Sequence, residues 1–224
     1  MKEKINEIFR RIDAVKKEYG ISEEITVVGA TKTVSAERIN ELPSCGITIA
    51  GENRVQELLE KYDSVKGVEW HLIGALQTNK VKYIIDKVSL IHSVDRQSLA
   101  DEIDRQAKKH NKKMPVLVEI NVGREENKSG IMPEQAEEFM SYVASKENLI
   151  LKGVMTVFPI DASDETYVEF QKFALKAKEK YGASVVSAGM SGDFEKAIRY
   201  GSNMVRLGSV IFGKRIYNQG EQNG

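Results

Sequence analysis

The chain alternates between short apolar runs and longer charged segments with helical periodicity. Apolar positions within the charged segments recur every three or four residues, as at Leu99, Ile103 and Ala107. Strands that are almost continuously hydrophobic and are separated by helices indicate a parallel sheet buried on both faces. Eight runs rich in β-branched residues predict such strands, and they begin at Ile25, Ile47, Glu69, Ser89, Pro115, Leu151, Ser184 and Asn203.

Eight strand and helix units favour the α/β class and a closed (β/α)8 TIM barrel, with an open doubly wound sheet as the structural alternative. Before the first strand, Ile5, Phe9, Ile12 and Val15 recur at helical spacing and predict an extra N-terminal helix. No Pro-, Gly- or Ser-rich linker interrupts the pattern. We therefore expect residues 1–224 to form a single domain, frayed only in the C-terminal segment NQGEQNG.

Composition narrows the class of protein. Hydrophobic residues make up 41% and charged residues 29%, as in a globular domain. Lys plus Arg and Asp plus Glu both number 33, so no net field attracts nucleic acid or an anionic membrane. Cys45 is the single cysteine and cannot form an internal disulfide, and the N-terminus is charged where a signal peptide would be apolar. No apolar run approaches the roughly 20 residues that a membrane-spanning helix needs. These observations predict a cytoplasmic protein without membrane contact.

Lys32 is the first candidate for chemistry because it ends the run VVGATK, which carries no other charge. The reactive face of a (β/α)8 barrel is formed by the C-terminal ends of its strands. A lysine placed there against apolar neighbours can attack an aldehyde carbon and form an imine. The alternative, with equal weight on position alone, is a solvated loop lysine.

The second candidate is an anion site at the ends of the last two runs. Ser191 and Gly192 open a predicted helix, where backbone N–H groups and the serine hydroxyl can face an anion. Gly208 and Ser209 fall within the last run, where the missing side chain of glycine lets a phosphate approach the backbone. Asp193 is a complication, because its carboxylate would repel a phosphate if it faced inward. Singly, Ser191 also fits an ordinary N-cap and Gly208 a packing glycine.

Arg206 lies two residues before Gly208 in an apolar strand, so both residues share one face. Its partner inside a barrel is either a pyridine nitrogen or a carboxylate such as Glu119, and sequence leaves both open. Asn53 could donate a hydrogen bond to a ring or its oxygen, whereas His71 is expected to be a core histidine. The three histidines show no ligand spacing, so no metal site is expected, and nucleotide-binding signatures are missing.

Several long segments occur in an order typical of one family: GATKTVSAERI, GENRVQE, WHLIGALQTNK, NKSGI, GMSGDFEKAI and GSNMVRLGSVIFG. On these segments the chain resembles the pyridoxal phosphate homeostasis proteins, whose barrel is similar to the N-terminal domain of alanine racemase. The match spans nearly the whole chain. Ser209 stands where a threonine is common and Ser35 where a proline is frequent; the first exchange keeps a hydroxyl.

The resemblance implies that the chain binds pyridoxal 5′-phosphate (PLP) as a Schiff base on Lys32. It implies further cofactor contacts from Asn53 and Met190, a phosphate site, and a guanidinium that faces the ring nitrogen. An arginine in this position leaves the nitrogen unprotonated and weakens the cofactor as an electron sink. The cofactor-binding residues are then expected to be Lys32, Asn53, Met190, Ser191, Arg206, Gly208 and Ser209.

The family also implies a function: buffering intracellular PLP and supplying PLP-dependent apoenzymes, without an established catalytic activity. Alanine racemases add a C-terminal domain with a catalytic tyrosine, and nothing after the eighth run matches it, which favours a monomer. Racemisation needs a base on each face of the substrate. The alternatives are a single-domain racemase or lyase that uses Lys32 as its base, and an interaction protein that binds no cofactor.

Overall fold

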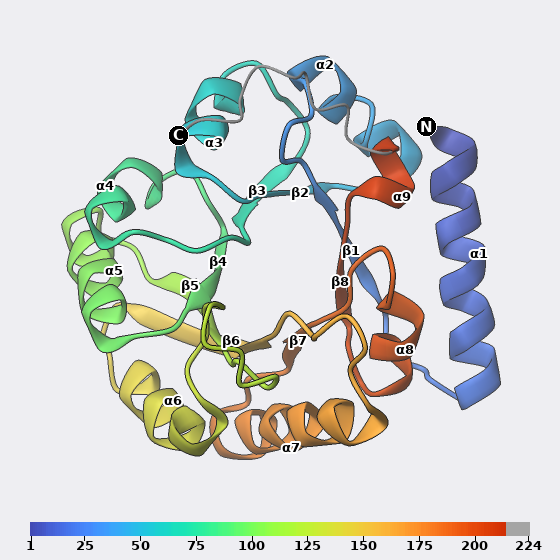
Figure 1. Ribbon diagram of the computed structural model, residues 1–224. Coiled ribbons are helices and arrows are strands. Elements are labelled where there is room, and N and C mark those ends of the chain that lie inside the picture. The colour runs from blue at the N-terminus through green and yellow to red at the C-terminus, as the bar shows by residue number, and fades with distance from the viewer. Residues whose placement is uncertain (214–224) are drawn as a thin grey trace.

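The computed structural model describes residues 1–213, and in this part of the chain eight parallel strands close into one barrel in sequence order. Each strand pairs with its neighbours along the chain, and β1 pairs with β8 to close the ring. The predicted barrel is confirmed (Figure 1). The strands are β1 (Thr26–Ala30), β2 (Ile49–Glu52), β3 (Glu69–Leu72), β4 (Leu90–Val94), β5 (Met114–Glu119), β6 (Leu149–Met155), β7 (Val185–Ser187) and β8 (Met204–Leu207).

Helices surround the barrel and cover the outward faces of its strands (Figure 1). The outer core lies between the strands and these helices, and its apolar side chains include Leu99, Ile103 and Phe139. The α-helices of the described residues are α1 (Lys2–Tyr19), α2 (Ala36–Ile39), α3 (Val55–Tyr62), α4 (Val81–Ile84), α5 (Gln97–Lys109), α6 (Ala136–Ala144), α7 (Asp164–Tyr181), α8 (Phe194–Arg199) and α9 (Ser209–Phe212).

A second, smaller core fills the interior of the barrel. It is made by inward-facing side chains, and successive strand positions alternate between this core and the outer one, as expected for strands buried on both faces. The interior is therefore a packed core beneath the mouth and not a channel. Its buried members are Val28, Ile73, Leu90, Leu117, Met155 and Met204.

The extra N-terminal helix α1 is present, as predicted. Its apolar stripe is buried and packs on α8 and α9 at the outside of the barrel (Figure 1). It ends at Gly20, whose φ of 66° is a left-handed conformation that favours glycine, and whose N–H donates to Lys16 O. Arg11 joins it to α8 through two hydrogen bonds to Glu195, of 2.9 and 2.7 Å.

Two predicted boundaries near the end of the chain are wrong. Gly208 and Ser209 do not belong to the eighth strand, because β8 ends at Leu207 and α9 begins at Ser209. Ser191 is not the N-cap of a helix, because α8 begins at Phe194 with Asp193 at the N-cap. The segment NQGEQNG lies outside the described residues. None of the described helices is long and apolar enough to cross a membrane.

Candidate functional site

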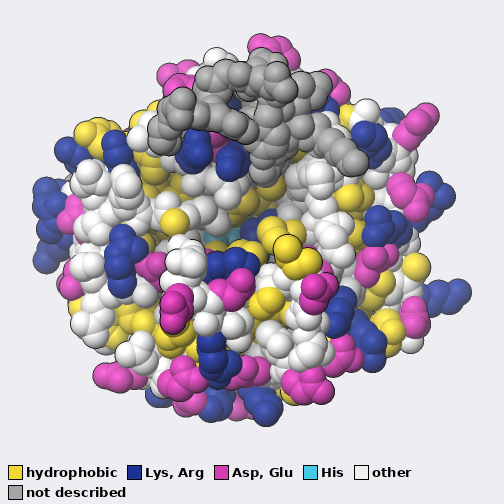
Figure 2. All heavy atoms as spheres, in the orientation of Figure 1, with side chains coloured by type: hydrophobic (Ala, Val, Ile, Leu, Met, Phe, Trp, Pro, Cys, Tyr) yellow, Lys and Arg dark blue, Asp and Glu magenta, His cyan; other side chains and the backbone are white. Residues whose placement is uncertain are grey.

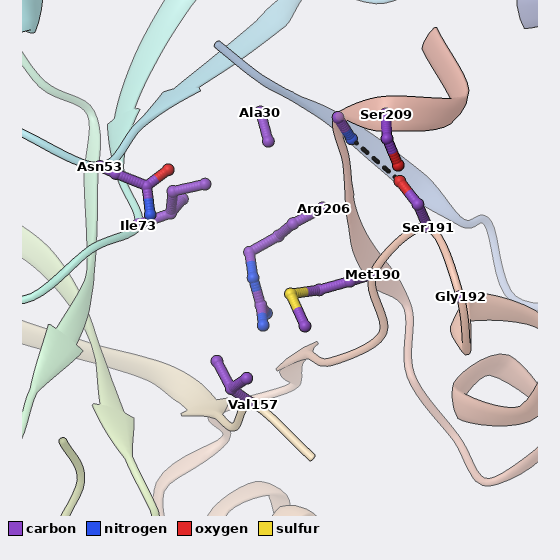
Figure 3. A pocket seen from close by; sticks show the side chains of 10 residues that line it. Ala30, Asn53, Ile73, Val157, Met190, Ser191, Gly192, Arg206 and Ser209 are labelled. Carbon is purple, nitrogen blue, oxygen red and sulfur yellow. Dashed lines mark hydrogen bonds between the residues drawn. The ribbon is translucent and has the colours of Figure 1, made fainter. Parts of the chain in front are cut away.

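A cavity of about 630 Å³ lies at the C-terminal ends of the strands. This volume is typical of a site for a small organic ligand. Figure 2 shows a hollow at the centre of this face with histidine at its base, and Figure 3 shows the side chains around the cavity. The cavity is lined by Ala30, Asn53, Ile73, Val157, Met190, Ser191, Gly192, Arg206, Gly208 and Ser209.

Six of the seven residues expected to bind a cofactor line this one cavity, although they come from positions 53 to 209 of the chain. Lys32 is half-buried and is not among the lining residues of the described chain. It follows Ala30 by two residues, and Ala30 does line the cavity. Because β1 pairs with β8, the segment that carries Lys32 leaves the barrel next to Gly208: a Cβ at Gly208 would lie 3.4 Å from Ala30 O.

The loop after β7 meets the first turn of α9 through the hydroxyl of Ser191. Ser191 Oγ accepts the N–H of Gly208 at 3.3 Å and that of Val210 at 3.5 Å (Figure 3 draws the first). Both distances are long for N–H···O bonds, so the two donors are only weakly satisfied. These N–H groups, with the Ser191 and Ser209 hydroxyls, form a group of donors at the edge of the cavity.

Asp193 does not face this group of donors. Its Oδ1 accepts the N–H of Met190 at 2.7 Å, and its Oδ2 accepts the hydroxyl of Tyr167 at 3.2 Å. Burial, together with the charge of Asp193, raises the pKa of Tyr167, so this hydroxyl stays a donor. The carboxylate is therefore directed away from the donors, which weakens the repulsion that it would exert on a bound phosphate, although its charge still acts on Arg206.

Arg206 is 4% exposed and lies at the base of the cavity. It donates to Ser187 Oγ at 2.7 Å and to Thr156 O at 2.8 Å. Among residues 1–213 it forms no ion pair, so the expected alternative of a structural pair with Glu119 is not what the structure contains. Burial lowers the pKa of Arg206 to about 10, against the opposing charges of Glu119 and Asp193.

A buried hydrogen-bonded chain continues from Arg206 through Ser187 to two histidines. Ser187 Oγ lies 3.0 Å from His92 Nδ1, and His92 Nε2 lies 3.0 Å from His71 Nδ1. Burial lowers the pKa of His71 to about 4 and that of His92 well below its usual value. Both rings are therefore neutral at physiological pH, and His71 is a core histidine, as expected.

Glu119 is the last residue of β5, near the hydrogen-bonded series of Arg206, Ser187 and the two histidines. Its Oε2 is buried without a hydrogen-bond partner among the described residues. Burial, with the charge of Asp95, raises the pKa of Glu119 to about 7, although Arg206 opposes the shift. Glu119 also lines a second cavity of about 290 Å³ that shares Asn53, Ile73 and Val157 with the first.

Sequence reasoning missed a group of charged residues that hold the turn around Lys32. Lys61, Glu52 and Glu57 bond to one another and to the two neighbours of that lysine: Lys61 donates to Thr31 O, Glu52 accepts the Thr31 hydroxyl and Glu57 accepts the Thr33 N–H. The turn is strained, because Thr33 has a φ of 63°, which costs a β-branched residue about 1–3 kcal/mol. Glu57 and Lys61 are four residues apart in a segment that follows a strand end, and this spacing was the available signal.

The buried members of the polar chain were also missed. His92 and Ser187 are 95 positions apart and neither belongs to a motif. The available signal was polar identity at inward-facing positions of otherwise apolar strands, the same signal that singled out Arg206.

These features define a class of protein: a parallel barrel with an anion-favouring mouth, in which amide and hydroxyl donors lie above a buried guanidinium. A family model described as the N-terminal domain of alanine racemase matches residues 5–216. The chain is 42% identical over 224 residues to a pyridoxal phosphate homeostasis protein of Aquifex aeolicus, covering 96% of this chain and 98% of that one. The chain therefore belongs to the family of alanine racemase N-terminal domains.

Solved structures agree with this assignment. An unknown protein from Bifidobacterium adolescentis has a TM-score of 0.84 at 29% identity and covers 94% of both chains. PipY from Synechococcus elongatus, solved with PLP bound, has a TM-score of 0.76 at 25% identity and covers 91% of this chain and 99% of that one.

Proposed function

We propose that this protein binds PLP in the barrel mouth and acts in PLP homeostasis. The observation that carries the proposal is the convergence of weakly satisfied amide donors and the buried Arg206 on one cavity, with the segment of Lys32 entering next to it. The names of its curated relatives and the PLP-bound structure of PipY support the choice of ligand.

The residues of the cavity fit the parts of this cofactor. The Gly208 and Val210 N–H groups and the Ser191 and Ser209 hydroxyls would hold the phosphate, and the carboxylate of Asp193 is directed away from these donors. Lys32 would hold the cofactor, because the aldehyde of PLP can condense with a primary amine to give a Schiff base and water.

The remaining residues would orient the ring. Arg206, held in place by Ser187 and Thr156, would face the ring nitrogen, and Asn53 the ring oxygen. Ile73, Val157 and Met190 offer an apolar surface against the ring faces.

The proposed role is reversible storage and delivery, not catalysis. A guanidinium does not protonate a pyridine nitrogen, so the arrangement gives little stabilisation to a carbanion. We further propose that the protein is a cytoplasmic monomer and that PLP-dependent apoenzymes receive the cofactor from it.

The test is the absorbance of the protein mixed with PLP, before and after borohydride, compared with Lys32→Ala. We expect an imine absorbance band at about 420 nm, and we expect borohydride to reduce this imine to a stable adduct on Lys32. An unchanged adduct in Lys32→Ala would assign the amine to another residue.

A second candidate is a single-domain racemase or lyase with Lys32 as its base, and membership of the alanine racemase family favours it. Incubation of the loaded protein with L- and D-alanine in deuterium oxide separates the two. Hydrogen exchange at Cα at enzymatic rates would establish the enzyme, whereas exchange no faster than with free PLP supports storage.

A further inference from the structure

The turn that carries Lys32 is tied down on both sides of the lysine. Thr31 is fully buried, its N–H donates to Gly51 O at 2.9 Å, and its hydroxyl donates to Glu52 Oε2 at 2.9 Å. On the other side, the N–H of Thr33 donates to Glu57 Oε2 at 2.8 Å. Both neighbours of Lys32 are therefore held by groups outside the turn.

The turn has a backbone shape that its sequence does not favour. Val34 N–H donates to Thr31 O at 2.9 Å, which closes a four-residue turn with Lys32 and Thr33 at its centre. Thr33 has a φ of 63°, a value that turns of this kind normally assign to glycine. Such a conformation persists in a β-branched residue only where the surroundings hold it.

Lys61 is the centre of the group that holds the turn. Its Nζ donates to Thr31 O at 3.0 Å, to Glu52 Oε2 at 2.9 Å and to Glu57 Oε2 at 3.0 Å. The side chains of Lys61, Glu52 and Glu57 are 13%, 0% and 19% exposed, so solvent screens these charges weakly. Burial opposes the ionisation of Glu57, but its bonds to Thr33 and Lys61 leave its pKa below the usual range.

We infer that Lys61, Glu52 and Glu57 are positioning residues for Lys32. They form a clamp that holds the Thr31–Val34 turn in its strained form, and this form fixes where the amine of Lys32 leaves the barrel wall. The clamp lies at the ends of β1 and β2, where Glu52 is the last residue of β2. Among the described residues, its hydrogen bond to a cavity-lining residue comes from the backbone N–H of Asn53, which donates to Glu52 Oε1 at 2.8 Å. The inference rests on the proposed function, in which Lys32 bonds to the cofactor.

Binding of two ligands distinguishes an effect of the clamp on Lys32 from an effect on the cavity. PLP reports both the cavity and the amine, whereas pyridoxine 5′-phosphate has an alcohol in place of the aldehyde and reports the cavity alone. For Glu57→Ala and Lys61→Met we expect affinity for PLP to fall about tenfold, with a smaller fraction of bound PLP trapped by borohydride. Affinity for pyridoxine 5′-phosphate should stay within about twofold of wild type.

Rescue distinguishes positioning from general loss of structure. Glu57→Gln keeps an oxygen that can accept the Thr33 N–H and should retain most of the affinity for PLP. Thr33→Gly removes the strain, so the double variant Glu57→Ala/Thr33→Gly should recover affinity to within about threefold of wild type. A matched control is Lys146→Met, which removes a different ammonium, paired with Asp101 between α5 and α6.

The outcomes are distinct. If the wild-type protein binds neither ligand, the proposed function fails. If Glu57→Ala and Lys61→Met bind and trap PLP like wild type, the clamp has no positioning role. If Glu57→Ala does not fold, Lys61→Met and Glu57→Gln still decide. A loss of PLP affinity in Lys61→Met that spares pyridoxine 5′-phosphate, with PLP affinity retained in Glu57→Gln, supports the inference. An equal loss of both ligands in Lys61→Met overturns it.

Discussion

Arg206 and Ser187 are joined by a hydrogen bond of 2.7 Å in the interior of the barrel. The same Ser187 hydroxyl lies 3.0 Å from His92 Nδ1, so one small side chain connects a buried cation to a buried neutral ring. Loss of this hydroxyl leaves two buried donors or acceptors without a partner, which is costly inside a protein.

Ser187→Ala should therefore lower the free energy of unfolding by about 1–3 kcal/mol, measured by urea denaturation without cofactor. Ser93→Ala is a matched control, because the Ser93 hydroxyl is equally buried and has no hydrogen-bond partner among the described residues. Its removal should be neutral or slightly stabilising. Equal losses in both variants would contradict the role assigned to the chain of hydrogen bonds.

The hydroxyl of Ser191 should matter only for ligands with a phosphate. Ser191→Ala removes one donor from the group around Gly208, and a hydrogen bond to a charged group contributes enough for about a tenfold loss of PLP affinity. Binding of pyridoxal, which lacks the phosphate, should be unchanged. Equilibrium titration of both ligands checks this, and an equal loss for pyridoxal would place the phosphate elsewhere.

Gly74 keeps Asn53 at the cavity wall. A Cβ at Gly74 would lie 2.4 Å from Asn53 O and 2.8 Å from Asn53 Cα, so Gly74→Ala must displace that backbone. We expect several-fold weaker PLP binding along with a loss of stability. Gly182→Ala is the control: it is strained by its φ of 65° but meets nothing within 4 Å, so it should lose stability and keep its affinity.

Glu119 should make stability depend on pH in a defined direction. Its pKa is raised in the folded state to about 7 from 4.5, so the protonated carboxyl favours folding at low pH and that contribution is lost as pH rises through 7. His71 acts in the opposite sense: its pKa is lowered to about 4, so its contribution is lost as pH falls from 6.5 toward 4.

The difference between Glu119→Gln and wild type isolates the carboxyl, since both proteins keep His71. Relative to wild type, the variant should gain about 2 kcal/mol in free energy of unfolding between pH 5 and pH 8. Urea denaturation at each pH measures it. A difference that does not change with pH would mean that Glu119 titrates normally in the folded protein.

The barrel could be predicted because its signal is repeated and local. Each strand contributes its own apolar run, and the alternation at Val28 and Val27 between the interior and the outer core is readable within a few residues. The boundaries around Ser191 and Gly208 could not be placed, because glycine and serine fit a strand end, a turn and a helix start equally well.

The contacts of the site were less accessible to sequence reasoning. The placement of Arg206 on the same side as Gly208 followed from strand alternation, but its partners Ser187 and Thr156 come from other strands. The side on which Asp193 turns depends on Tyr167, 26 positions away. Such choices are set by tertiary contacts that leave no periodic pattern.

The neutral hydrogen-bond partners of Arg206, Ser187 and Thr156 O, also affect how a PLP-bound form of the protein would react with free amino acids. In the proposed binding mode, a guanidinium held by a serine and a peptide carbonyl would lie against the ring nitrogen, where a transaminating enzyme places a carboxylate. A ring so held would draw few electrons from any amino acid that reached it. In that binding mode, the choice of a guanidinium over a carboxylate would let the protein hold PLP with little further reaction of the amino acids that reach it.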